Sequence, residues 1–154
     1  MEKFILLLLA VILFSCGSPA DSLEELDLMK EGIPLKIKAP EDSEVKQMDM
    51  GIFKDITVKK GEDFYVQITE ATMLNNDIKA RKDEELNTVQ DLSTFSKVVK
   101  EEERGFIFEK KRGEEMVYDF RSIKFVGDNE YLFQAGLVGN FSLNEVEVMF
   151  DAVK

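Results

Sequence analysis

The chain has 154 residues and a formal net charge of −11, and it contains one cysteine and no histidine. An acidic surface repels phosphate backbones, which excludes nucleic acid from the expected partners. Without histidine, the chain lacks Ser-His-Asp and Cys-His nucleophile pairs and His-ligated zinc or copper, so carboxylates are the remaining candidates for catalysis.

The N-terminus begins with Met1-Glu2-Lys3, and an unbroken apolar run follows over residues 4–14. A helix of this length rises roughly 16 Å, which is about half of the hydrocarbon core of a bilayer. The run therefore predicts the apolar region of an export signal rather than a membrane-spanning helix.

The end of this run carries Leu13-Phe14-Ser15-Cys16, which resembles the lipobox of bacterial lipoproteins. The resemblance implies cleavage by signal peptidase II and acylation of Cys16 as the new N-terminus. Each buried CH₂ contributes ~0.8 kcal/mol, so two or three acyl chains would form a stable anchor. The alternative is an ordinary secretory signal with a chance cysteine at its edge. Gly17 differs from the aspartate that resembles an inner-membrane retention signal, which favours an outer membrane facing the periplasm in a diderm cell.

These signals divide the chain into three parts. Residues 1–15 are the expected signal peptide, residues 16–31 a lipidated N-terminus with a flexible tether, and residues 32–154 one globular domain. The small and polar residues after the cysteine predict the tether, with a helical turn over residues 23–28. Such a tether spans on the order of 20 Å and holds the domain just off the bilayer.

Alternating apolar and polar residues predict strands in the first half of the domain. A half-buried edge strand is expected over residues 34–40, which prolines bracket, and two more strands are expected at 45–50 and 52–60. A turn at residues 60–63 leads into a strand over 64–69. Asn75-Asn76-Asp77 can cap a helix over 77–90, and the thin apolar stripe of this segment predicts a surface position.

The second half of the domain is expected to be a meander of hairpins. Strands at 95–103, 106–111, 114–126 and 131–137 are separated by turns that contain glycine. The apolar register slips near Arg121, which predicts a β-bulge there. Ser142 and Glu145 form a capping box for a C-terminal helix that carries Val146 and Phe150 on one face.

This order of elements predicts an α+β fold, with a mainly antiparallel sheet and a middle helix and a C-terminal helix packed on it. In its topology the domain resembles the PsbP/Mog1-like α/β/α sandwich, and a cystatin-like α+β arrangement is the alternative. The resemblance rests on the order of the elements, and it implies a protein that acts by association.

Three acidic segments and one methionine pair are the candidates for metal or catalytic chemistry. They are Glu41-Asp42-Ser43-Glu44, Glu101-Glu102-Glu103, Glu114-Glu115 and Met48-Asp49-Met50. The first segment lacks the alternating ligands and central glycine of a calcium loop, so we expect a solvated turn. The other two acidic segments lie at strand ends, where adjacent residues point to opposite faces and form no catalytic pair. The methionines suit copper(I), but we expect them to fill an apolar strand face.

The sequence therefore predicts no catalytic residue, metal site or cofactor. We expect a non-catalytic, membrane-anchored lipoprotein whose domain binds an envelope protein or assists assembly of an envelope complex. The alternative is a binder of a small apolar or lipidic ligand, in a pocket that phenylalanine and methionine line. A hydrolase that depends on carboxylates ranks last. The aromatic residues expected in the core are Phe64, Phe106, Phe108, Tyr118, Phe120, Phe125, Tyr131 and Phe133.

Overall fold

The computed structural model describes residues 22–154, and the predicted signal peptide lies outside the described residues. The described chain begins with a two-stranded sheet, in which β1 (Glu24–Asp27) pairs antiparallel with β2 (Lys36–Ala39). A short 3-10 helix, η2 (Leu28–Glu31), follows β1. The predicted helical turn and flexible tether over this stretch are wrong, because β1 is paired and Leu28 is fully buried in the core. Residues 24–31 therefore belong to the fold, together with the domain predicted from residue 32 onward.

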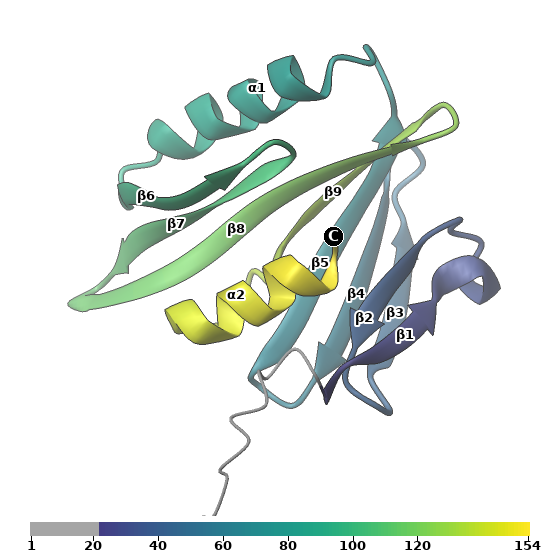
Figure 1. Cartoon of the computed structure of the whole chain (residues 1–154), viewed down its shortest axis with the longest axis horizontal. Helices are drawn as coiled ribbons and strands as arrows, with labels where there is room; N and C mark the ends of the chain where they lie inside the picture. Colours follow the sequence, from purple (N-terminus) through teal and green to yellow (C-terminus); the bar gives the residue numbers. More distant parts are fainter. Residues whose placement is uncertain (1–21) are drawn as a thin grey trace, which may run out of the picture.

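One seven-stranded antiparallel sheet and two helices form the rest of the domain (Figure 1). The strands are β3 (Glu44–Asp49), β4 (Lys54–Lys60), β5 (Phe64–Thr72), β6 (Phe95–Glu102), β7 (Gly105–Arg112), β8 (Glu115–Val126) and β9 (Asn129–Ala135), and the helices are α1 (Ile78–Gln90) and α2 (Leu143–Ala152). The strands lie in the order β3-β4-β5-β9-β8-β7-β6, so β9 returns to the middle of the sheet and joins its two halves. This arrangement confirms the predicted α+β fold.

Helix α1 covers one face of the sheet at β6 and β8. Asp77 caps the helix by accepting a hydrogen bond from the Ala80 amide at 3.0 Å, as the sequence predicts. The apolar contact of α1 is small, and its buried part is Val89, which packs with Phe106 and Phe108 of β7. The thin apolar stripe thus places α1 on the surface, as expected.

The opposite face of the sheet carries α2 and the β1–β2 pair, and it holds the main core. The predicted capping box is present, since the Ser142 amide donates to Glu145 at 2.6 Å and the Glu145 amide donates to Ser142 Oγ at 3.4 Å. Phe150 packs edge-to-face on Phe120 with 5.8 Å between the ring centroids. Full burial of one such ring contributes about 1.5–3 kcal/mol, so this contact is a main attachment of α2 to the sheet.

Arg121 explains the apparent slip of register in β8. It pairs regularly with Phe106 on β7 and with Gln134 on β9, so the predicted bulge at this position is wrong. Its guanidinium lies on the α1 side of the sheet, 3.7 Å from Glu85, while the preceding Phe120 belongs to the core under α2. Both faces of β8 are covered here, so buried residues do not alternate with solvent-exposed ones. The shifts of register lie in β6 instead.

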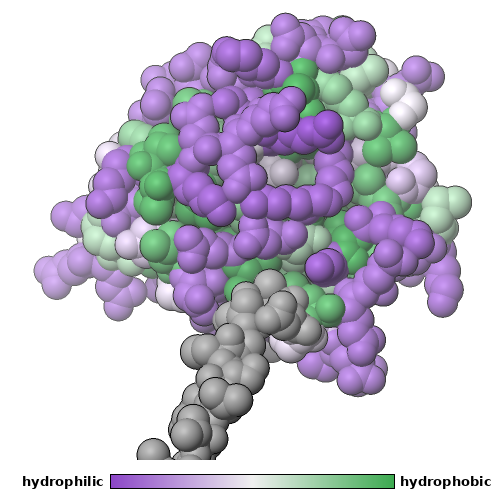
Figure 2. All heavy atoms as spheres, viewed as in Figure 1, coloured by the Kyte–Doolittle hydropathy of each residue, from purple (hydrophilic) through white to green (hydrophobic). Residues whose placement is uncertain are grey.

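Of the aromatic residues expected in the core, Tyr118 and Phe125 are half-buried and the others are buried. The surface on the side of α2 is mostly hydrophilic, with apolar residues in separate small patches (Figure 2). Within residues 22–154, no helix has the length and apolar character needed to cross a membrane.

Candidate functional site

The predicted lipobox residues Leu13, Phe14, Ser15 and Cys16 precede the described residues, so acylation of Cys16 stays a prediction. The structure does show where residues 22 and 23, which precede β1, lie on the domain. Their position determines which end of the domain an anchor at Cys16 would hold near the membrane, and therefore which surfaces would face away from it.

The described chain begins at the end of the sheet that carries the β4–β5 turn, hereafter the anchor end. Leu23 lines a small pocket there together with Asp63 of this turn and Phe64 at the start of β5. A stretch of seven residues, such as 16–22, extends at most about 25 Å. An acylated Cys16 would therefore hold the anchor end within about 25 Å of the bilayer.

The acidic segments are solvated or paired with lysines. Ser43 Oγ in the turn after β2 donates to the main-chain oxygen of Pro40 at 2.7 Å, and the three acids of this turn are all exposed. Glu101 and Glu102 end β6, as expected, and each forms an ion pair with a lysine. Among residues 22–154, no group of three or more acidic, histidine or cysteine side chains could hold a metal ion.

Met48 and Met50 do not fill a buried strand face, and that prediction is wrong. Met48 lies on the edge strand β3 and is 61% exposed, and Met50 lies in the β3–β4 turn and is 54% exposed. Ile52 follows in the same turn and is 85% exposed. The reason is that β3 ends the sheet, and the described elements leave this turn uncovered.

Leu74, which follows β5, adds a fourth apolar side chain at this end of the sheet and is 97% exposed. Leu74 lines one pocket and Ile52 lines a neighbouring one, and Ala71 and Thr72 at the end of β5 belong to both. Met48, Met50, Ile52 and Leu74 together are hereafter the apolar tip.

The apolar tip and the anchor end lie at opposite ends of the sheet (Figure 1). Strand β5 begins at the anchor end with Phe64 and ends at the apolar tip with Thr72, and its 9 residues span about 30 Å. The apolar tip therefore points away from the point at which the described chain enters the domain.

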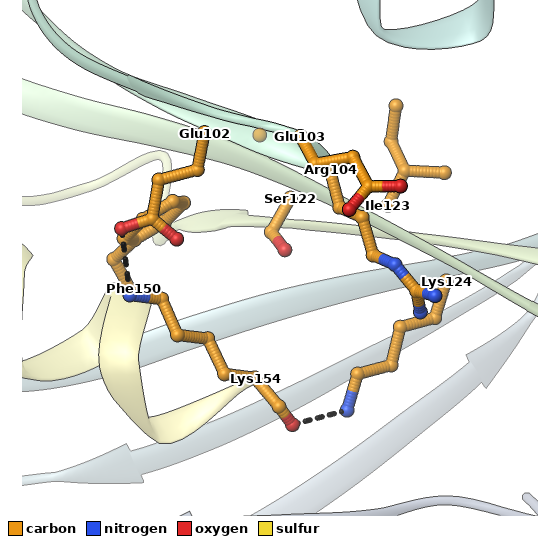
Figure 3. Close-up of a pocket in the computed structure, with 9 residues that line it drawn as sticks. Glu102, Glu103, Arg104, Ser122, Ile123, Lys124, Phe150 and Lys154 are labelled. Atoms are coloured by element: carbon orange, nitrogen blue, oxygen red, sulfur yellow. Dashed lines mark hydrogen bonds and ion pairs between the residues drawn. The ribbon is translucent and has the colours of Figure 1, made fainter. Parts of the chain in front are cut away.

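A pocket of about 400 Å³ lies between the β6–β7 turn, β8 and the C-terminal end of α2 (Figure 3). Arg104 lies in the turn, and its main-chain oxygen accepts a hydrogen bond from the Ile123 amide of β8 at 2.9 Å. Gly105 follows and allows this close approach, because a Cβ atom there would overlap the carbonyl oxygen of Arg121 and lie 3.0 Å from the Phe150 ring. The wall of the pocket is thus fixed by backbone contacts.

Glu102 on one side of the pocket is neutralised by two lysines. Its carboxylate lies 2.8 Å from Lys154 Nζ and 3.1 Å from Lys100 Nζ. The hydrogen bond from Lys154 lowers the pKa of Glu102, although partial burial opposes the shift. The two ammonium groups also lie over the Phe150 ring, 4.8 and 5.6 Å from its centroid. The charge of Glu102 is therefore satisfied within the domain.

Lys124 lies on another side of the same pocket (Figure 3). Its Nζ donates to the main-chain oxygen of Lys154 at 2.9 Å and lies 5.7 Å from the centroid of the Phe133 ring. Burial lowers the pKa of Lys124, and the positive charge of Arg104 adds to this shift. Arg104, which is exposed, and Lys124, which is half-buried, therefore both face the pocket.

Ser122 completes the pocket between these charges. Only 5% of its surface is exposed, and its hydroxyl points into the pocket (Figure 3). Within the part of the chain that the structure describes, this hydroxyl makes no hydrogen bond and the Arg104 guanidinium makes no ion pair. No hydrogen bond joins Ser122 to Lys124, so the two residues lack the contact that a Ser–Lys nucleophile pair requires.

Sequence reasoning did not single out Arg104, Ser122 or Lys124. A signal for the last two exists, because Phe120, Ser122 and Lys124 alternate along β8 and therefore share one face. Phe120 belongs to the core, whereas Ser122 and Lys124, the next two residues on the same face, are polar. This change from apolar to polar residues marks the edge of the core, where a pocket can form. Arg104 carries no such signal, because its position depends on the pairing of β7 with β8.

Comparison of the chain with protein-family models, with curated proteins and with solved structures found no match. The resemblance in topology to the PsbP/Mog1-like sandwich therefore stays a prediction.

Proposed function

We propose that the chain is a non-catalytic lipoprotein, anchored through an acylated Cys16, whose apolar tip binds a protein of the cell envelope. In a diderm cell the proposed location is the outer membrane, facing the periplasm. The observation that carries the proposal is the exposure of four apolar side chains at the end of the sheet opposite the anchor end.

The apolar tip has the character of a binding surface. Scattered single apolar residues are ordinary on protein surfaces, but a group at one place is typical of an interaction site. Ile52 and Leu74 are almost fully exposed, and burying either against a partner would contribute about 1.5–3 kcal/mol. Methionine is unbranched and polarizable, so Met48 and Met50 can adapt to the shape of a partner.

A protein fits the apolar tip better than the anchoring bilayer does. The short stretch between Cys16 and Leu23 keeps the anchor end close to the lipid. The apolar tip lies about 30 Å farther along β5, on the far side of the domain. Groups that face away from the membrane meet other envelope proteins, which favours an accessory or assembly role.

The alternative of a small apolar ligand rests on the pocket of about 330 Å³ at the anchor end, which Leu23, Phe64 and Val148 line and to which no methionine contributes. The space between the sheet and α2 is filled by buried side chains, among them Phe120, Phe133 and Phe150. The pocket beside the end of α2 is lined mainly by charged residues. Neither feature offers a phenylalanine- and methionine-lined cavity.

The proposal can be tested by purification of crosslinked envelope complexes with matched surface variants. The test protein carries Ile52→Asp and Leu74→Asp, which place charges on the apolar tip. The control carries Leu137→Asp, a position that is 71% exposed and follows Gly136, whose amide bonds Tyr65 at the anchor end.

We expect one envelope protein to be recovered with the wild type and with the Leu137→Asp control. Its recovery should fall at least tenfold with the tip variant, as expected when apolar anchors of an interface are lost. Equal recovery with all three proteins, or recovery of no specific protein with any of them, would overturn the proposal.

A further inference from the structure

The pocket between the β6–β7 turn, β8 and the end of α2 shares no residue with the apolar tip. We infer that this pocket is an anion-binding site, in which Arg104, Lys124 and Ser122 hold a carboxylate or phosphate group of a small molecule or of a larger envelope component. The inference concerns a second site and does not depend on the proposed protein partner.

The charges that line the pocket favour an anion. Glu102 is already neutralised by Lys154 and Lys100, so it does not compensate the remaining cations. Arg104 and Lys124 are left facing the pocket in a chain whose net charge is −11. Glu103 also borders the pocket; like Arg104 it is exposed on the turn, and it forms no ion pair within residues 22–154, so it offsets part of the positive charge. An anion between Arg104 and Lys124 would relieve the repulsion between them.

The donors that the pocket offers are complementary to an oxyanion. Lys124 uses one of its three N–H groups on the main-chain oxygen of Lys154, which leaves two for a ligand. The Arg104 guanidinium presents a planar fork of N–H groups, which matches two oxygens of a carboxylate or phosphate. Each bond from an ionised donor to a charged acceptor is stronger than one between neutral groups.

Ser122 provides the second, independent observation. A hydroxyl without an acceptor in the protein can donate its hydrogen to a ligand. Ser122 is 5% exposed, its hydroxyl makes no hydrogen bond within residues 22–154, and it points into the pocket (Figure 3). An oxyanion there would accept its hydrogen and satisfy it.

The size of the pocket and the Phe150 ring bear on what carries the anion. A volume of about 400 Å³ is within the range of small-molecule sites and exceeds what a bare inorganic ion needs. The Phe150 ring lines the pocket beside the polar groups, so the rest of the ligand would meet an apolar wall. An anionic group attached to an organic body fits both features.

Nuclear magnetic resonance of the mature, isotope-labelled protein in detergent micelles can test the site. Acetate and inorganic phosphate are the two probes, and sodium chloride at matched ionic strength is the control for non-specific effects. We expect saturable shifts of the amide signals of Arg104, Ser122 and Lys124 with at least one probe. A response to acetate alone would identify a carboxylate ligand, and a response to phosphate alone would identify a phosphate ligand.

Variants separate binding in the pocket from general attraction to cations. Arg104→Gln and Ser122→Ala should each raise the dissociation constant of the probe. For Arg104→Gln we expect an increase of at least tenfold. The control is Arg112→Gln, since Arg112 is exposed and bonds the main-chain oxygen of Gly139 away from the pocket. Shifts that do not saturate, that chloride reproduces, or that Arg104→Gln leaves unchanged would overturn the inference.

Discussion

Lys82 on α1 lies with its Nζ 2.5 Å from Glu101 Oε1 on β6, and the lysine side chain is almost fully buried while the glutamate is half exposed. The methylene stem of Lys82 therefore packs beneath the helix while its charged end reaches an acid that keeps contact with water. This contact compensates for the small apolar area that α1 offers to the sheet.

Replacing this lysine should separate the contribution of its stem from that of its charge. We predict that Lys82→Ala lowers the free energy of unfolding by about 1–3 kcal/mol, because packing and the ion pair are both lost. Lys82→Met keeps most of the packing, and Glu101 can be hydrated, so its effect should stay below about 1 kcal/mol. Urea unfolding measures both. A wild-type stability for Lys82→Ala would contradict this account of α1.

Tyr131 on β9 is fully buried, and its hydroxyl is the one buried side-chain polar atom without a hydrogen-bond partner among residues 22–154. Burial raises the pKa of Tyr131, and the nearby Asn129 side chain, whose amide donates to Glu70 at 3.0 Å, opposes only part of this shift. We predict that Tyr131→Phe leaves stability unchanged or raises it by up to about 1 kcal/mol, since it removes an unsatisfied group. Tyr118→Phe is the matched control and should lower stability, because it removes a 3.0 Å hydrogen bond to Glu109. Thermal unfolding compares them, and a marked loss with Tyr131→Phe would contradict the prediction.

Glu109 on β7 should make stability depend on pH. Its carboxylate accepts hydrogen bonds from Ser96 at 2.8 Å and from Tyr118 at 3.0 Å. The bond from Ser96 lowers the pKa of Glu109 most, that from Tyr118 adds to the shift, and burial opposes both. Because the folded pKa lies below the ordinary value of about 4.3, this stabilisation is complete above about pH 4.3 and is lost as the pH falls through the folded pKa.

The measurement for Glu109 is urea unfolding of the wild type and of Glu109→Gln at pH 7 and at about pH 3. The variant should be less stable than the wild type at pH 7, and the difference should shrink at the lower pH. A difference that is the same at both pH values would show that the carboxylate charge is not its origin.

Cys16 carries the proposed anchor, and its removal has a defined consequence. We predict that Cys16→Ala leaves the precursor uncleaved or releases a soluble protein, because no acyl chains can then be attached. Fractionation of cells and the mass of the mature protein measure this. If the variant still matures normally and stays with the membrane fraction, acylation at Cys16 is not the anchor.

Local signals were sufficient to predict most of the fold. Asp77 before α1 and the Ser142–Glu145 capping box before α2 act within a few residues, and both helices begin where these caps predict. Glycine in tight turns marked the hairpins, for example Gly61 with φ 59° between β4 and β5. Such features need no knowledge of distant residues.

Features that depend on distant contacts could not be predicted in this way. The polar segment that forms β1 resembles a tether until its pairing with β2 and the burial of Leu28 are known. Arg121 resembles a register error until α1 and Glu85 are placed above it. The anion-binding site has the same origin, because Arg104 and Ser122 meet only when β7 pairs with β8.

Site-specific photo-crosslinking in intact cells that make the lipoprotein tests the proposed role of the apolar tip most directly. A photoreactive side chain would replace Ile52 at the apolar tip, and Leu137 at the anchor end would be the position-matched control, since both are apolar and largely exposed. We predict one crosslinked protein adduct of defined mass from position 52 and none of that mass from position 137. The absence of any protein adduct at position 52, or the same adducts from both positions, would contradict it.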